Sequence, residues 1–68
     1  MDMQIYRASV SRPESIARAQ QARHAIERAG GKIMVFPPTR EGMTIIELRL
    51  PPGLHPSDFL PELPFYLV

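Results

Sequence analysis

Residues 11–31, SRPESIARAQQARHAIERAGG, hold the clearest local signal in the chain. Alanine, arginine, glutamine and glutamate dominate this stretch, and all four favour a helix. Ser11 and Glu14 have the spacing of a capping box, in which each side chain accepts a hydrogen bond from the other residue's free backbone N–H. Pro13 falls in the first turn, where its missing N–H is not needed. Gly30 and Gly31 end the segment, because glycine adopts a left-handed conformation without strain. We therefore predict one helix over residues 11–29.

One side of this helix is apolar. The apolar residues recur at spacings of three and four, which traces one stripe along a helix; they are Ile16, Ala19, Ala22, Ile26 and Ala29. Most of them are alanines, and small side chains let a helix lie close to its neighbour. We expect the stripe to pack on strands and not on a second helix.

Outside the helix, apolar alternation predicts four strands, over residues 3–10, 32–36, 43–50 and 65–68. The two middle strands are joined by the turn TREG (39–42), in which Gly42 is free to take a positive φ. A second helix is predicted to begin near His55, and Pro61 and Pro64 limit it to one or two turns. The order βαββαβ predicts an α+β fold of the ferredoxin-like kind, a four-stranded antiparallel sheet with both helices on one face.

In this arrangement the other face of the sheet is left uncovered. If Ile33, Val35, Ile46 and Leu48 point toward the helices, the alternation places a second set of side chains on the open face. This second set consists of Met34, Phe36, Met43, Ile45, Glu47 and Arg49. An exposed apolar patch that includes Met34, Phe36 and Ile45 is unusual on a monomer and indicates a contact surface.

Size and composition favour a single domain that depends on a partner. The chain has 68 residues and no cysteine, and a domain of this length buries only about 60% of the surface of its unfolded chain. Natural domains this small usually gain stability from disulfides, a metal or association. The sequence offers no cysteine pair and no cluster of metal ligands, so we expect residues 1–68 to form one domain that binds a protein partner or a second copy of itself.

The bulk charge and hydropathy give no reason to expect a nucleic acid or a membrane as partner. The formal net charge is only +1. The charge is unevenly spread, with six basic and three acidic residues in 1–34 and two basic and four acidic residues in 35–68. No apolar run approaches the ~20 residues of a membrane span, and the first residues lack the pattern of a signal peptide. We expect a cytoplasmic protein.

Catalysis is not expected either. His24 and His55 are isolated, and no serine has the base and orienting group that a nucleophile needs. No cofactor motif is present, since Gly30-Gly31 precedes a strand and not a helix. RNA-recognition domains share the predicted architecture, but the strand 32–36 supplies only one aromatic residue and lacks their glycine–aromatic motif.

From the glycine pair onward the sequence resembles the subtilisin-type propeptide (peptidase-inhibitor) family. The resemblance is carried by AGGKIMVF (29–36), by Gly42, by IELRLPP (46–52) and by FLPELPFYLV (59–68). It implies a non-enzymatic inhibitor or folding assistant of a subtilisin-like serine protease. In that family the open sheet face lies against two surface helices of the protease, and a C-terminal tail enters the substrate cleft. We expect two departures from the family, a second helix shortened by prolines and no tail after Val68.

The partner-binding residues expected from this resemblance and from the open face are Met34, Phe36, Met43, Ile45, Glu47, Phe65, Tyr66, Leu67 and Val68. Glu47 is expected to cap the N-terminus of a partner helix with its carboxylate. The alternative is a homo-oligomeric regulatory or assembly subunit. Residues 20–36 are similar to small phycobilisome linker polypeptides, and the predicted fold is similar to that of ligand-sensing ACT domains, although Val10-Ser11-Arg12 lacks the glycine that ACT domains usually place there.

Overall fold

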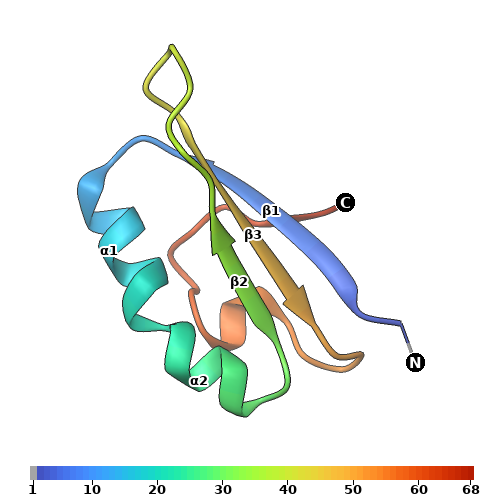
Figure 1. Ribbon diagram of the computed structural model, residues 1–68. Coiled ribbons are helices and arrows are strands. Elements are labelled where there is room, and N and C mark those ends of the chain that lie inside the picture. The colour runs from blue at the N-terminus through green and yellow to red at the C-terminus, as the bar shows by residue number, and fades with distance from the viewer. Residues whose placement is uncertain (1) are drawn as a thin grey trace.

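The computed structural model describes residues 2–68, which form a four-stranded antiparallel sheet with one bent helix (Figure 1). The elements in chain order are β1 (Gln4–Val10), α1 (Pro13–Gln21), α2 (Arg23–Arg28), β2 (Lys32–Val35), β3 (Thr44–Leu50), the 3-10 turn η1 (Pro56–Asp58) and β4 (Tyr66–Leu67). The strand order across the sheet is β2-β3-β1-β4. The predicted α+β class and the four-stranded antiparallel sheet are confirmed.

The two longest strands form the centre of the sheet. β1 and β3 pair over seven residues, with Arg7 opposite Glu47 and Val10 opposite Thr44. β2 adds to the outer side of β3, and the short β4 adds to the outer side of β1. β2 and β4 are therefore the edge strands.

The core lies between the helical segments and one face of the sheet. Its side chains come from alternate positions of the strands, as the period of two requires; they include Tyr6, Ala8, Val10, Ile33, Ile46, Leu48 and Leu50. Ala19 of α1 and Ile26 of α2 are fully buried against them, which confirms that the alanine-rich stripe packs on strands. The predicted sidedness of β3 is also confirmed, since Thr44, Ile46, Leu48 and Leu50 are all buried.

The helix differs from the prediction at its start and in its middle. It begins at Pro13, and its N-cap is Arg12, which is extended and makes no side-chain cap hydrogen bond. The predicted Ser11–Glu14 capping box is therefore wrong, and the Glu14 carboxylate instead lies 3.5 Å from Nε of Arg12. The helix also bends at Ala22, where ψ is −9°. Because Ala19 and Ile26 are buried on either side of this residue, the bend lets both reach the twisted sheet.

The connection between β2 and β3 projects beyond the sheet (Figure 1). Thr39 and Met43 close it through a backbone hydrogen bond of 2.8 Å from Thr39 N–H to the Met43 carbonyl. Gly42 has a φ of +79°, as predicted for this turn. The hairpin is confirmed, with each of its strands one residue shorter than expected.

The second predicted helix is reduced to the single turn η1. Pro56 begins this turn, and Pro61 and Pro64 follow it, so no longer helix can form. Leu60 of this segment is fully buried in the core, and Leu54, Phe59, Leu63 and Phe65 pack against it. The chain then returns as β4, and the backbone N–H of Val68 donates to the carbonyl of Ile5 over 2.8 Å.

Candidate functional site

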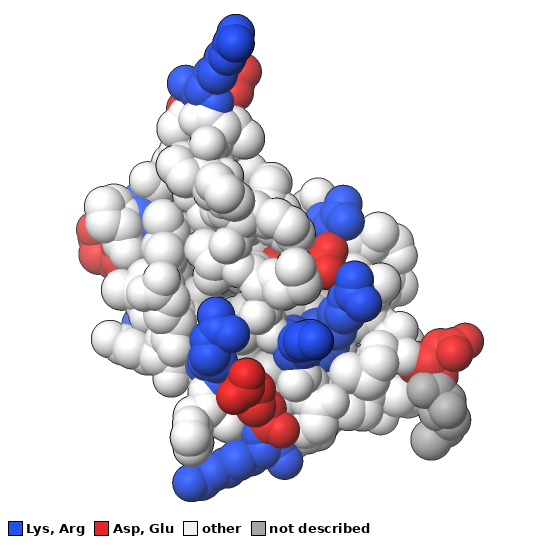
Figure 2. All heavy atoms as spheres, viewed as in Figure 1, with Lys and Arg blue, Asp and Glu red and all other residues white. Residues whose placement is uncertain are grey.

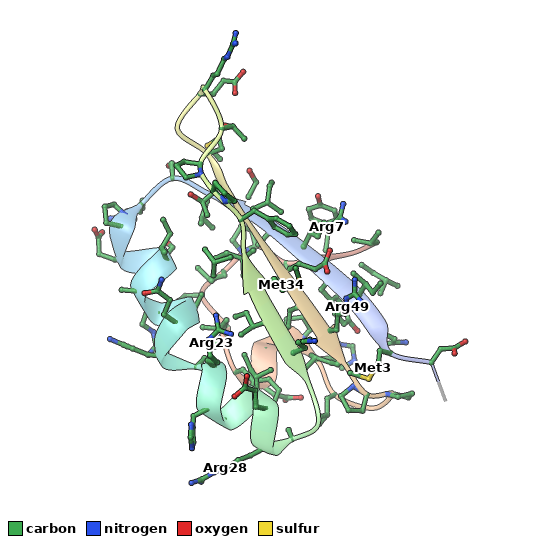
Figure 3. The ribbon with its side chains drawn as sticks, viewed as in Figure 1. Met3, Arg7, Arg23, Arg28, Met34 and Arg49 are labelled. Atoms are coloured by element: carbon green, nitrogen blue, oxygen red, sulfur yellow. The ribbon has the colours of Figure 1, made fainter. Side chains whose placement is uncertain are left out.

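The sheet face opposite the helical segments has no layer above it, and we call it the open face. The strand register places its side chains; they are Ile5, Arg7 and Ser9 of β1, Lys32 and Met34 of β2, Ile45, Glu47 and Arg49 of β3, and Tyr66 of β4. Figure 3 shows Arg7, Met34 and Arg49 near one another over the middle of the sheet. Figure 2 shows several Lys and Arg side chains over the middle and lower part of the same view, where Figure 3 places Arg23 and Arg28 of α2 as well as Arg49.

A charged cluster of Arg7, Glu47 and Arg49 occupies the centre of the open face. Nε and Nη2 of Arg7 both lie 3.0 Å from Oε1 of Glu47. Nε of Arg49 lies 3.0 Å from Oε2 of the same carboxylate. Both carboxylate oxygens are thus bound, each by a different guanidinium. We call these three residues the arginine–glutamate cluster.

Glu47 is buried although the face has no covering layer. Its side chain is only 3% exposed, whereas each of the two arginines is 46% exposed. Burial alone would raise the pKa of the Glu47 carboxyl, but the hydrogen bonds and positive charges of Arg7 and Arg49 outweigh this effect and hold its pKa below the ordinary value. Glu47 therefore remains ionised at neutral pH and fixes the two guanidinium groups in place.

This geometry changes the role expected of Glu47. The sequence predicts an exposed carboxylate that caps a partner helix. In the structure both of its oxygens are already bound and the group is shielded from solvent. The exposed polar atoms at this point belong to the arginines, so the chemistry that the face presents is cationic and not anionic.

The apolar residues expected on the open face differ in their position and in how exposed they are. Met34 is opposite Glu47 in the register and is 39% exposed. Phe36 and Ile45 are half-buried, and the Phe36 N–H donates to the Ile45 carbonyl over 2.9 Å. Met43 lies apart from this group, because it precedes β3 and lines a shallow hollow together with Arg12 and other residues at the far end of the sheet. Met34, Phe36 and Ile45 are thus brought together, and Met43 is not.

The last four residues divide between the two faces. Tyr66 pairs with Arg7 and lies on the open face. Leu67 pairs with Tyr6 and is turned to the helical side, where it is nevertheless 61% exposed. Phe65 and Leu67 line a hollow of about 220 Å³ on that side, next to Leu60 and the η1 turn. The predicted C-terminal contact residues therefore do not form one surface.

Sequence reasoning missed Arg7 as a member of the site. Arg7 alternates with Ile5 and Ser9 in the first strand, which assigns it a face but no partner. Its contact with Glu47 spans 40 residues of sequence and depends on the register of β1 against β3. Opposite charges directly across a strand pair are a recognised stabilising arrangement, but the sequence alone does not show which residues face each other.

His24 and His55 are both exposed. Within residues 2–68, no three His, Asp or Glu side chains come together where a metal ion could be held. Neither helix in this part of the chain has the length and apolar character needed to cross a membrane.

Comparison of this chain with known protein families, with curated proteins and with solved structures finds no match. The function of the chain is therefore inferred from the geometry of the open face.

Proposed function

We propose that this protein is a non-enzymatic protein-interaction module with a reduced ferredoxin-like fold. The strand order β2-β3-β1-β4, with helical segments after β1 and after β3, supports this fold, because two interleaved right-handed βαβ units give the same order. We call the fold reduced because the single turn η1 stands in place of the second helix.

One observation carries the proposed function. The large apolar side chains that are exposed in residues 2–68 are Met3, Met34, Tyr66, Leu67 and Val68. Met34 and Tyr66 lie on the open face, and Figure 3 places Met3 near Arg49. Leu67 belongs to the edge strand β4 but is turned to the helical side, and Val68 follows β4. A chain of 68 residues that exposes Met34 and Tyr66 on a sheet face with no covering layer presents a contact surface there.

The specific form of this proposal is a stand-alone inhibitor or folding assistant of a subtilisin-like protease, as the sequence resemblance implies. In this form the open face binds the surface helices of the protease, and the exposed β4 segment lies next to the substrate cleft. The exposure of Tyr66, Leu67 and Val68 supports it.

The experiment is a titration of subtilisin activity with the pure protein, with the mass of the protein measured by light scattering. We expect saturable inhibition near one-to-one stoichiometry. Met34→Glu and Ile45→Glu should weaken it at least about tenfold, because each places a charge in a desolvated contact. Deletion of residues 65–68 should also weaken it. Ala25→Glu is the matched control, since Ala25 is exposed on α2, away from the open face.

Circular dichroism of each variant separates loss of binding from loss of fold, and Met34 is the safer site because it is already partly exposed. If folded Met34→Glu and Ile45→Glu both retain inhibition and mass unchanged, the open face is not the contact surface and the proposal is wrong.

A homo-oligomeric assembly subunit is the second candidate, and the outer edge of β4 favours it. On β2, Nη1 of Arg23 donates to the outward carbonyl of Ile33 over 3.3 Å and so occupies part of that edge. β4 pairs only with β1, and its outer edge carries the exposed Leu67. An uncovered apolar edge strand is a template for pairing with another chain. A dimer mass without inhibition of subtilisin would support this candidate over the first.

A further inference from the structure

The open face carries more positive charge than its one carboxylate neutralises. Arg7, Arg49 and Lys32 supply three cationic groups there, and Lys32 is opposite Arg49 in the register. Glu47 is the acidic residue among the strand positions of this face. Three cations and one anion leave a surplus of two positive charges, on a molecule whose net charge is only +1. The surplus is therefore concentrated on this face.

The two guanidinium groups keep most of their hydrogen-bond donors free of Glu47. Arg7 directs Nε and Nη2 toward Oε1, and Arg49 directs Nε toward Oε2. A guanidinium has five N–H donors in a rigid fork, and both arginine side chains are about half exposed. Glu47 acts here as a positioning residue, because it orders both arginines before any partner arrives. A ligand that meets ordered donors loses less conformational entropy on binding.

Apolar side chains surround this charged centre. Met34 is opposite Glu47 on one side, and Tyr66 is opposite Arg7 on the other. Ile45 lies two residues before Glu47 on the same face, next to the half-buried Phe36. A matching ligand therefore combines carboxylates at its centre with apolar groups around them. Helices are the elements that normally complete the uncovered side of a sheet, and an amphipathic helix presents both kinds of group on one face.

We propose that the open face binds an acidic amphipathic helix of a partner protein, with two carboxylates four residues apart that pair with Arg7 and Arg49. This inference rests on the proposed interaction function and names the chemistry of the partner. The spacing agrees with it. Arg7 and Arg49 are diagonal neighbours in the sheet, and such residues lie about 7–8 Å apart, with their Cβ atoms somewhat closer. Side chains four residues apart on a helix have Cβ atoms about 5–6 Å apart. The flexible glutamate side chains of the partner helix span the difference.

The same face is poorly suited to single-stranded nucleic acid. Such ligands stack their bases on exposed aromatic rings of the central strands. On this face the central strands carry Ile5, Arg7 and Ser9 in β1 and Ile45, Glu47 and Arg49 in β3, with no aromatic residue among them. Tyr66 lies on the edge strand, and a buried carboxylate occupies the centre. The acidic helix is therefore the better match.

The test uses two labelled helical peptides that differ only at two positions. One is an alanine- and leucine-based helix with glutamate at two positions four residues apart, and the other has glutamine there. We expect fluorescence anisotropy to show at least about tenfold tighter binding of the glutamate peptide, since hydrogen bonds between two charged groups are among the strongest in proteins. This difference should shrink as salt is added. In NMR spectra of the unmodified protein, the side-chain Nε–Hε signals of Arg7 and Arg49 should shift.

The variant pair Arg7→Gln/Arg49→Gln should remove the preference for glutamate. Arg12→Gln/Arg18→Gln is the matched control, because these arginines also pair with glutamates, Glu14 and Glu62, but lie outside the open face. Arg7→Lys/Arg49→Lys guards against misfolding, because it keeps the charge near Glu47 and removes the guanidinium fork. We expect it to bind the glutamate peptide more weakly than the unmodified protein does.

Equal binding of the two peptides, or an equal loss in the control pair, would overturn the inference. So would tighter binding of oligothymidylate that shifts the same arginine signals, because the ligand would then be a nucleic acid. If Met34→Glu abolishes peptide binding while Arg7→Gln/Arg49→Gln does not, the open face still docks a partner and only the acidic helix is wrong. If neither variant affects peptide binding, the open face does not dock the helix. The interaction function itself fails only if Met34→Glu and Ile45→Glu also leave the inhibition of subtilisin and the mass unchanged.

Discussion

At the scale of single residues, Glu47 shows how a charge can be buried on a face that nothing covers. A buried carboxylate is costly unless both of its oxygens are bound. Here Arg7 and Arg49 bind one oxygen each, and their side chains shield the group from solvent. The arginines remain half exposed and keep part of their hydration. The result is a fixed pair of cations beside the apolar side chains of Met34 and Ile45.

Replacing Glu47 with glutamine should destabilise the fold and alter its pH dependence. At pH 7 we expect Glu47→Gln to lower the free energy of unfolding by about 1.5–3 kcal/mol, the range for hydrogen bonds to charged groups. Because the pKa of Glu47 is lower in the folded state, its contribution is present above the ordinary value of 4.5 and is lost as the pH falls through the lowered pKa.

Urea unfolding at several pH values between 7 and 3 measures this effect. The difference between the unmodified protein and Glu47→Gln should shrink below about pH 4.5. Glu41→Gln is the control, since Glu41 is exposed at the tip of the hairpin. Two curves that stay parallel down to pH 3 would show that the ion pairs contribute nothing to stability.

At the scale of elements, the segment between β3 and β4 is held to the core by apolar side chains, of which Leu60 is the most deeply buried. It contains no regular helix beyond η1, and Leu60 is its one fully buried apolar residue. Leu→Ala changes in a core cost about 2–5 kcal/mol. We expect Leu60→Ala to cost about 3 kcal/mol and to increase hydrogen exchange in β4 more than in β2.

The neighbouring change Glu62→Ala is the control for Leu60→Ala. It removes only the half-exposed pair between Glu62 and Arg18 at 3.2 Å, so we expect a loss of less than about 1 kcal/mol in urea unfolding. A similar loss in both variants would mean that Leu60 does not anchor the segment.

The elements themselves could be predicted from local patterns, and the site could not. Alternation in the strands, the glycines of the turns and the alanine stripe each depend on neighbours in sequence. The bend at Ala22 and the loss of the capping box depend on how the helix meets the sheet. The open face could be predicted through β3, but the partner of Glu47 could not, because Arg7 reaches it only through the register of β1.

At the scale of the whole molecule, folding cancels the charge asymmetry of the sequence. The basic first half and the acidic second half meet in the Arg7–Glu47 and Arg18–Glu62 pairs. The radius of gyration is 11.3 Å, close to the ~11 Å expected for a compact chain of this length. The charge is still unevenly distributed over the surface, because cations and exposed apolar groups share the open face.

Because the domain is small, its Tm responds strongly to a bound partner. A ligand at 100 times its Kd stabilises the folded state by about 2.7 kcal/mol. For domains of about 60–100 residues, 1 kcal/mol shifts Tm by about 4–8 °C, so a partner bound at this level should raise Tm by about 10–20 °C. Subtilisin, in an inactivated form, and the glutamate peptide are the first ligands to measure by differential scanning calorimetry.

The thermal shift should depend on the open face. We expect Met34→Glu to reduce it by about half or more, as a loss of affinity of at least about tenfold requires. Ala25→Glu should preserve it, because only the first substitution lies on that face. A shift of equal size in Met34→Glu would mean that the ligand binds elsewhere, and the hollow beside Phe65 and Leu67 would then be the surface to change next. Partner binding and fold stability are thus coupled through one face of a sheet that lacks a second layer.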